Sequence, residues 1–250
     1  MEGYDDRSYG RAFADVYDDW YRDISDVHTT VADLVRLAGS GPVLELGIGT
    51  GRLAVPLAQA DPDLAVVGID SSPEMLGRLG DRMPPPNLTA HVGDMVDDLP
   101  IGPFTLVFVA YNTLFNLTTA ARQRRCFSEV AGRLTLGGRF VVEAFVPDEP
   151  PRDGDLVEVR TLAADRVVLS ISRHDARDQR AEGQFVELSE TDGVRLRPWS
   201  IRYASPAELD AMAAAVGFEL EMRWESFGGL EWQPESARHV SVYRLGSSAA

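Results

Sequence analysis

Three glycines at alternate positions follow a short apolar run, and this segment is the part of the chain best suited to bind a ligand. Gly47, Gly49 and Gly51 come directly after the mostly apolar residues 42–46. Glycine has no Cβ, so it accepts positive φ angles and lets a small molecule touch the main chain. Glu45 stands two residues before the first glycine and adds a carboxylate. We therefore expect a ligand-binding turn at the carboxyl end of a strand.

The spacing of these glycines differs from that of the dinucleotide-binding fingerprint. That fingerprint is G-x-G-x-x-G, and here the third glycine comes one residue early. The pattern acid-x-G-x-G-x-G resembles the first motif of the class I, Rossmann-like S-adenosylmethionine-dependent (SAM-dependent) methyltransferases. The resemblance implies that residues 47–51 lie against the methionine half of SAM and that Glu45 helps to position the methionine amine.

Two further acids end the next two predicted strands. Asp70 closes the strand at residues 64–70, where a carboxylate can accept hydrogen bonds from both ribose hydroxyls, and Ser71 follows it. By the resemblance, Asp94 would accept from the adenine amine and Met95 would lie against the adenine ring. The alternative is that these acids are only polar strand ends that face water.

The segment at residues 109–117 leaves the fourth predicted strand at the edge where open α/β sheets bind ligands. Ala110 is expected to lie beside the cofactor. Tyr111, Asn112 and Phe115 are expected to face the sulfonium or the substrate. Tyr111 and Asn112 are therefore candidate catalytic residues, and Phe115 is a candidate substrate contact.

Aromatic residues recur at helical spacing between residues 9 and 21, which predicts a helix. Such a helix could cover the ligand site as a lid. Tyr17 is then a candidate substrate contact and Tyr21 a candidate cofactor contact, because aromatic faces attract a cationic sulfonium. The alternative is a helix that only packs on the sheet.

Composition and charge limit the classes of function. The chain has 250 residues with 44% hydrophobic residues, enough for one domain with an insertion. Its 24 basic residues, all arginine, face 39 acidic ones, for a net charge of −15. The lack of lysine excludes Schiff-base and P-loop lysine chemistry. The acidic balance argues against a nucleic-acid partner and favours a neutral or cationic small molecule.

The sequence predicts a cytoplasmic protein without a membrane partner. No run approaches the roughly 18 apolar residues of a membrane span, and the first residues are polar and acidic. The single cysteine, Cys126, cannot form an internal disulfide, and its apolar neighbours place it on the buried face of a helix.

Strands and helices alternate along the chain, which predicts an α/β fold with a doubly wound, mostly parallel seven-stranded sheet covered by helices on both faces. The predicted strands are residues 42–46, 64–70, 88–92, 104–110, 139–145, 218–224 and 239–245. The predicted helices are residues 9–21, 27–37, 52–60, 119–134 and 205–217, and another that begins after the capping Ser72. We divide the chain into an N-terminal helical lid (1–40), a SAM-binding core (41–150), an insertion (151–204) and a C-terminal return to the core (205–250).

The insertion at residues 151–204 shows the alternation of an antiparallel sheet. Strands are predicted at residues 156–160, 166–171, 184–188 and 195–203. The segment with Trp199, Arg202 and Tyr203 resembles the small-molecule branch of the family, which includes glycine and aminosugar N-methyltransferases and natural-product peptide N-methyltransferases. By this resemblance these three residues border the acceptor, or the insertion builds the interface of a homodimer.

Methyl transfer is an in-line displacement on an activated sulfonium, so the protein mainly aligns the acceptor and excludes water. Tyr111, His174, Glu143 and His239 are candidates to take or orient a proton, and structural roles remain open for both histidines. We place His174 with the candidate catalytic residues. The four histidines lack ligand spacing and there is one cysteine, so no metal is expected.

The favoured function is transfer of a methyl group from SAM, leaving S-adenosylhomocysteine, to a nitrogen or oxygen of a small molecule or short peptide in bacterial specialised metabolism. Nitrogen is preferred because the acidic balance suits a cationic amine. The alternatives are a SAM-binding cyclase or regulatory partner that no longer methylates, and a carboxyl or phenol O-methyltransferase. The segment 111–114 lacks the proline-rich turn of nucleic-acid amine methyltransferases, and the glycine spacing disfavours a nicotinamide dehydrogenase.

Overall fold

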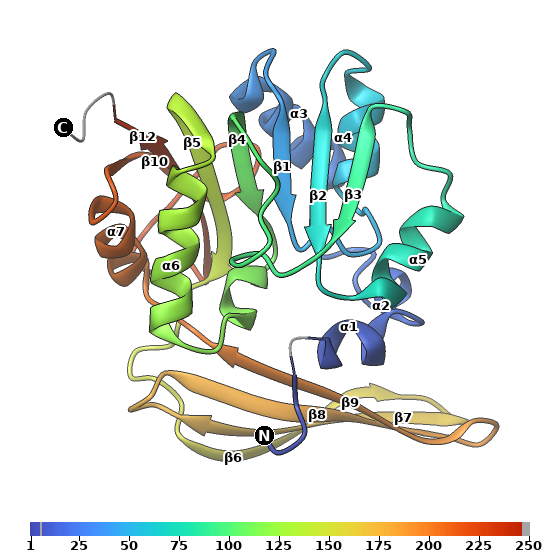
Figure 1. Ribbon diagram of the computed structural model, residues 1–250. Coiled ribbons are helices and arrows are strands. Elements are labelled where there is room, and N and C mark those ends of the chain that lie inside the picture. The colour runs from blue at the N-terminus through green and yellow to red at the C-terminus, as the bar shows by residue number, and fades with distance from the viewer. Residues whose placement is uncertain (6, 247–250) are drawn as a thin grey trace.

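A computed structural model describes residues 1–5 and 7–246, which form two separate β-sheets and their helices (Figure 1). The larger sheet has eight strands in the order β11-β10-β12-β5-β4-β1-β2-β3. Strands β1 to β5 pair with one another in parallel. β12 pairs antiparallel with β5, and β10 and β11 continue the sheet in antiparallel pairs. Their bounds are β1 (Val43–Leu46), β2 (Val66–Asp70), β3 (Leu88–Val92), β4 (Phe104–Val109), β5 (Leu134–Phe145), β10 (Phe218–Ser226), β11 (Leu230–Glu231) and β12 (Arg238–Leu245).

The predicted fold class is confirmed, with two differences in the large sheet. The sheet has eight strands rather than seven, because the two-residue β11 pairs with the end of β10. β5 begins at Leu134 rather than at residue 139, so it runs through Gly137 and Gly138. Neither difference moves the carboxyl ends of β1 to β4, where the candidate site was expected.

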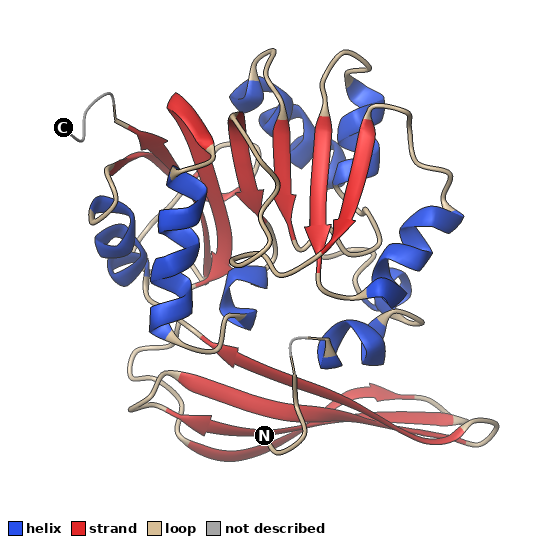
Figure 2. Ribbon diagram, in the orientation of Figure 1, coloured by secondary structure: helices blue, strands red, loops and turns tan. Residues whose placement is uncertain are grey.

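Helices cover both faces of the large sheet (Figures 1 and 2). α3 (Val27–Ala38), α4 (Ala54–Ala60) and α5 (Pro73–Asp81) lie on one face, and α6 (Ala120–Ala131) and α7 (Pro206–Ala214) on the other. The predicted caps form: Ser72 and Ser205 accept hydrogen bonds from the main-chain N–H groups that open α5 and α7. Cys126 is fully buried in α6, as predicted.

The single helix predicted for residues 9–21 was wrong, since the segment forms α1 (Ser8–Phe13) and α2 (Tyr17–Trp20). The guanidinium of Arg197 donates a hydrogen bond to the carbonyl of Ala12. In a continued α-helix that carbonyl would accept from Val16 N–H. Val16 N–H donates to the carbonyl of Phe13 instead, which gives a tighter turn. A cation from the insertion therefore interrupts the helix.

The insertion forms a four-stranded antiparallel sheet beneath the carboxyl ends of the large sheet's parallel strands (Figure 2). Its strands, in spatial and chain order, are β6 (Gly154–Leu162), β7 (Arg166–Asp175), β8 (Arg180–Ser189) and β9 (Gly193–Arg202). α1 lies between this sheet and the core (Figure 1). All four strands fall within the predicted insertion.

Arg202, at the end of β9, ties the insertion sheet to the core. Its side chain is buried, with one nitrogen 2.6 Å from Gln123 Oε1 on α6 and the other 2.6 Å from Glu208 Oε1 on α7. The amide of Gln123 returns a 2.7 Å hydrogen bond to the carbonyl of Arg202. This network fixes the point where the chain re-enters the core.

We expect Arg202→Met to lower the free energy of unfolding by about 3 kcal/mol, because the change removes the partner of buried polar groups. The control is Arg195→Met, which breaks the half-exposed ion pair between Arg195 and Asp15 and should cost less than about 1 kcal/mol. Urea unfolding measures both. Equal losses in the two variants would show that the Arg202 network does not hold the two parts together.

Candidate active site

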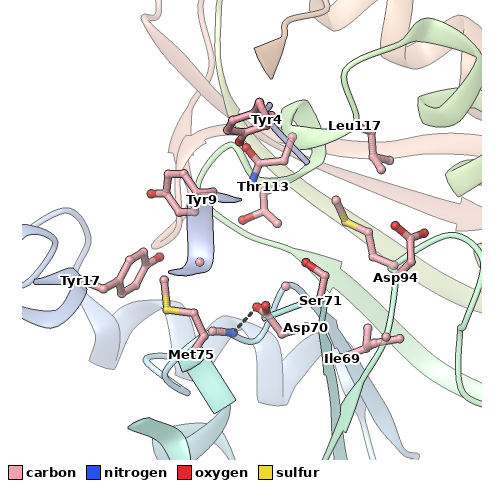
Figure 3. A pocket seen from close by; sticks show the side chains of 16 residues that line it. Tyr4, Tyr9, Tyr17, Ile69, Asp70, Ser71, Met75, Asp94, Thr113 and Leu117 are labelled. Atoms are coloured by element: carbon pink, nitrogen blue, oxygen red, sulfur yellow. Dashed lines mark hydrogen bonds between the residues drawn. The ribbon is translucent and has the colours of Figure 1, made fainter. Parts of the chain in front are cut away.

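A hollow opens at the carboxyl ends of β1, β2 and β3, with an empty volume of about 770 Å³ that includes open solvent. Its walls come from the loops after these strands, from the N-terminal segment with α1 and from the short helix η1 (Thr113–Asn116). Seven of the predicted site residues line it: Tyr17, Gly47, Gly49, Asp70, Ser71, Asp94 and Met95. The tyrosines lie on one side, Asp94 on the other, and Asp70 and Ser71 between them (Figure 3).

The three glycines of the loop after β1 have positive φ angles of 70°, 56° and 78°. A Cβ on Gly47 would lie 2.4 Å from Thr113, and one on Gly51 would lie 2.4 Å from Leu79. A Cβ on Gly49 would have only the carbonyl of Gly47, 4.0 Å away, within reach. Gly47 and Gly51 are therefore required by packing, whereas Gly49 leaves main chain open to the hollow.

Asp70 is held in place by two main-chain donors. Gly49 N–H lies 2.8 Å from one carboxylate oxygen and Ser72 N–H 2.9 Å from the other. Each carboxylate oxygen retains a lone pair for a further donor, so the group can still accept from two hydroxyls. Burial raises its pKa above the usual range, and the two N–H groups oppose that shift.

Asp94 is fixed by the loop that follows it and by α6. One carboxylate oxygen accepts from the N–H groups of Val96 and Asp97 at 2.8 and 2.9 Å, and the other lies 2.6 Å from Arg122. Arg122 therefore orients an acid of the hollow from another element. The two residues lie 28 positions apart in the chain, and no local sequence pattern indicates that they meet.

Glu45 is an orphaned acid behind the glycine loop. Its residue is 4% exposed, and its Oε2 atom has no hydrogen-bond partner. Burial raises the pKa of this carboxyl to about 8, although the nearby Arg52 opposes the shift. A buried carboxylate oxygen without a partner is costly unless a ligand supplies one. An ammonium group is the matching ligand chemistry.

Four tyrosines gather beside the hollow. Tyr9 donates a 3.3 Å hydrogen bond to the hydroxyl of Tyr21, the rings of Tyr17 and Tyr21 lie 4.8 Å apart, and Tyr111 follows at 5.6 Å from Tyr21. Burial raises the pKa values of Tyr9, Tyr17 and Tyr111, so their phenols are neutral at neutral pH. Tyr4 and Tyr9, which also line the hollow, were missed as site residues. The aromatic periodicity that predicted Tyr17 also contained Tyr9.

Tyr111 and Asn112 form a strained turn at the end of β4, with φ angles of 44° and 64°. Three hydrogen bonds to β5 hold the turn. Tyr111 N–H lies 2.9 Å from the Glu143 carboxylate, Asn112 N–H lies 3.0 Å from the Glu143 carbonyl, and Phe145 N–H lies 2.7 Å from Asn112 Oδ1. Left-handed angles in non-glycine residues are costly and persist only when the surroundings enforce them. Glu143 thus positions Tyr111, and the carbonyl oxygen of the Asn112 amide is engaged in the scaffold.

The remaining predicted residues lie elsewhere. Phe115 is fully buried against Phe145, and Tyr21, Gly51 and Ala110 are buried behind the lining of the hollow. His174, Trp199 and Tyr203 line a second hollow, between Phe145 and the insertion sheet, which shares no lining residue with the first. Arg202 is occupied by Gln123 and Glu208, as described above. His239 is buried and bonded to Ser241, and burial lowers its pKa to about 4.

Within the described residues, no group of three or more His, Cys, Asp or Glu side chains could hold a metal ion. The helices of residues 1–5 and 7–246 include none that is both long and apolar enough for a membrane span.

Comparisons with known proteins place the chain in a family. Residues 43–138 match the model of a family described as a methyltransferase domain. The structure of the CcbJ methyltransferase from Streptomyces caelestis is 37% identical, with a TM-score of 0.90 over 98% of this chain and 100% of that chain. The chain belongs to the SAM-dependent methyltransferases.

Two further relatives of this methyltransferase are more distant. CalS10 from Micromonospora echinaspora, a SAM-bound amino pentose methyltransferase involved in calicheamicin biosynthesis, is 25% identical over 92% of this chain and 96% of its own, with a TM-score of 0.68. An uncharacterized methyltransferase of Anoxybacillus flavithermus is 27% identical over 147 residues, which span 53% of this chain and 66% of that protein.

The cofactor of this methyltransferase is SAM. The chemistry of this region fits the group. One carboxylate oxygen of Glu45, behind the glycine loop, has no partner and would match the ammonium, the main chain at Gly49 is open, and the fixed carboxylate of Asp70 can accept from hydroxyls. When bound, SAM would supply an electrophilic methyl group, and these are the residues that would hold it.

We expect Asn112→Ala to lower the free energy of unfolding by about 2 kcal/mol, because alanine is strained at a positive φ and loses the bond to Phe145. Asn112→Gly is the matched control. It loses the same bond but accepts the angle, so it should cost about 1 kcal/mol. Thermal and urea unfolding provide the measurement. Identical losses would show that the turn is not strained.

Proposed function

We propose that this methyltransferase transfers the methyl group of SAM to an amine nitrogen of a small molecule or short peptide in bacterial specialised metabolism. The tyrosine cluster at the side of the cofactor hollow carries the proposal. Its aromatic faces attract a cation. Burial raises the pKa values of Tyr9, Tyr17 and Tyr111, so these phenols offer hydrogen bonds without adding charge. The net charge of −15 suits a cationic amine that approaches the site. CalS10, an amino pentose methyltransferase, supports the same substrate class.

The proposed cofactor assignment follows the order of the strands. Glu45 pairs with the ammonium of SAM and the main chain at Gly47 and Gly49 lies along its methionine part. Asp70, with Ser71 beside it, accepts from the ribose hydroxyls. Asp94 and Met95 border the adenine. These roles are supported by the orphaned oxygen of Glu45 and the two fixed oxygens of Asp70.

On the acceptor side, Tyr17, Tyr21 and Tyr111 would align the amine and exclude water, which is the main contribution that a protein makes to this displacement. Burial raises the pKa values of Tyr17 and Tyr111 above the usual range, so these phenols orient the acceptor and do not remove its proton. An amine attacks in its neutral form, and its proton then passes to a carboxylate or to water. Glu143 is the carboxylate closest to this turn in the hydrogen-bond network, 2.9 Å from Tyr111 N–H.

Calorimetric titration with SAM and S-adenosylhomocysteine, followed by a methylation screen, tests the function. We expect micromolar binding that weakens at least about 100-fold in Asp70→Ala, because two charge-assisted hydrogen bonds are lost. The control is Asp63→Ala, which removes an exposed carboxylate outside the hollow and should leave binding unchanged. Mass spectrometry should then detect methylated products among amines. Methylation of phenols or carboxylic acids alone would overturn the choice of nitrogen, and absence of SAM binding by folded protein would overturn the whole proposal.

Binding of SAM should release close to one proton per site near pH 7. The pKa of Glu45 is raised to about 8 without a ligand, so the carboxyl is mostly protonated at pH 7. An ammonium beside it favours the ionised form and lowers that pKa, so the proton leaves. Titrations in buffers of different ionisation enthalpy measure the release, and Glu45→Gln should remove it. Proton-neutral binding by the wild type would contradict the pairing of Glu45 with the ammonium.

A further inference from the structure

Arg52 differs from the other partly buried arginines of the chain because no described carboxylate pairs with it. It directly follows Gly51, the last glycine of the loop after β1, and one of its guanidinium nitrogens donates a 2.7 Å hydrogen bond to Ser25 Oγ. A partly buried cation without an anion is costly, so a ligand anion would be a favourable partner. Every other described arginine that is at least partly buried has a carboxylate oxygen within 3.7 Å of its guanidinium: Arg122, Arg133, Arg139, Arg197, Arg202 and Arg223.

The charge of Arg52 acts on several groups of the candidate site. Burial raises the pKa values of Glu45, Glu143, Tyr17 and Tyr111, and in each case the positive charge of Arg52 opposes the shift. These groups belong to β1, to β5 and to the tyrosine cluster. Arg52 is therefore a cation that these three parts of the site share.

The methionine end of SAM brings an anion into an acidic site. It carries a carboxylate and an ammonium on the same carbon, and the proposed assignment gives the ammonium to Glu45. Asp70 and Asp94 line the hollow, and Arg122 is already paired with Asp94 at 2.6 Å. The carboxylate of SAM would be repelled by these acids unless a cation lay close to it. A positive group is therefore needed next to Glu45.

Arg52 and Glu45 are suited to receive the two charges of an amino acid. Glu45 Oε2 has no hydrogen-bond partner, and the Arg52 guanidinium, which has five N–H donors, donates to the neutral hydroxyl of Ser25. The two side chains are near enough for the charge of Arg52 to act on the Glu45 carboxyl, yet they do not form an ion pair with each other. An α-amino acid between them would place its ammonium at the acid and its carboxylate at the cation.

We infer that the guanidinium of Arg52 binds the carboxylate of the methionine part of SAM, an inference that rests on the proposed assignment of Glu45 to the ammonium. A guanidinium fork matches the two oxygens of a carboxylate and can bind both at once. Ser25, in the segment between α2 (Tyr17–Trp20) and α3 (Val27–Ala38), holds one nitrogen of that fork and so positions it. Arg52 then distinguishes the intact cofactor from adenosine compounds that lack the carboxylate.

Calorimetric titration with a matched pair of ligands tests this contact. S-adenosylhomocysteine is compared with S-adenosyl-3-thiopropylamine, which keeps the adenosine and the amine but lacks the carboxylate. The wild type should bind the second ligand at least about 10-fold more weakly, because a charge-assisted bidentate contact is lost. Arg52→Met should weaken binding of S-adenosylhomocysteine by a similar factor. It should not weaken binding of the amine, which has no carboxylate for Arg52 to hold.

Arg52→Lys and Arg124→Met are the matched controls. Lysine keeps the charge but not the fork, so its affinity for S-adenosylhomocysteine should lie between those of the wild type and Arg52→Met. Arg124 is exposed on α6, and its replacement changes the net charge by the same amount. Both affinities of Arg124→Met should stay within about 2-fold of the wild type, because an exposed distant charge is screened. Thermal unfolding without ligand checks that each variant is folded.

The outcomes separate this inference from the proposed function. Equal weakening of both ligands by Arg52→Met would show that Arg52 supports the loop and does not bind the carboxylate. Unchanged affinity of that variant for S-adenosylhomocysteine would overturn the inference as well. In both cases, binding by the wild type and its loss in Asp70→Ala would leave the proposed function intact. Absence of binding by folded wild type would overturn both.

Discussion

The buried guanidinium of Arg197 is the interaction on which the shape of the site depends. It lies between the insertion and the N-terminal helices, 2.6 Å from Asp15 and 3.1 Å from Glu187, and it also donates to the carbonyl of Ala12. A cation with 3% exposure must have such partners, because an unpaired charge at that depth costs several kcal/mol. Because Arg197 takes the carbonyl of Ala12, α1 ends at Phe13 and the chain continues through a tighter turn to α2. The tyrosines that follow therefore lie beside the cofactor hollow.

The core and the insertion contribute different parts of the site. The core supplies fixed acceptors at the carboxyl ends of parallel strands. Asp70 is held by two main-chain N–H groups, and Asp94 by two main-chain N–H groups and the side chain of Arg122. The insertion sheet packs against the N-terminal aromatic segment, through Phe185 and Arg160 against Trp20. The methyl donor is common to the family, so the cofactor-binding core by itself does not distinguish one acceptor from another.

The fold could be predicted from the sequence because its signals are local. Apolar runs, capping serines and strand alternation depend on neighbours a few residues apart, and all seven predicted strands of the large sheet form. What the sequence did not reveal depends on distant partners. The break in the first helix comes from Arg197, and Arg122 reaches Asp94 from another element. The strand predicted at residues 166–171 stopped short of His174, and no local signal could tell which hollow this residue would border. The roles of the site residues remain predictions.

The position of Asp70 also limits which adenosine compounds suit the hollow. Its two carboxylate oxygens accept from Gly49 N–H and Ser72 N–H, and the residue lines the hollow. On the proposed assignment, this acid stands at the ribose of the ligand. A phosphate on either ribose hydroxyl would remove a hydrogen-bond donor and place a like charge against the carboxylate. Compounds phosphorylated at that position would therefore bind poorly, whereas SAM, with unmodified ribose hydroxyls, offers two donors.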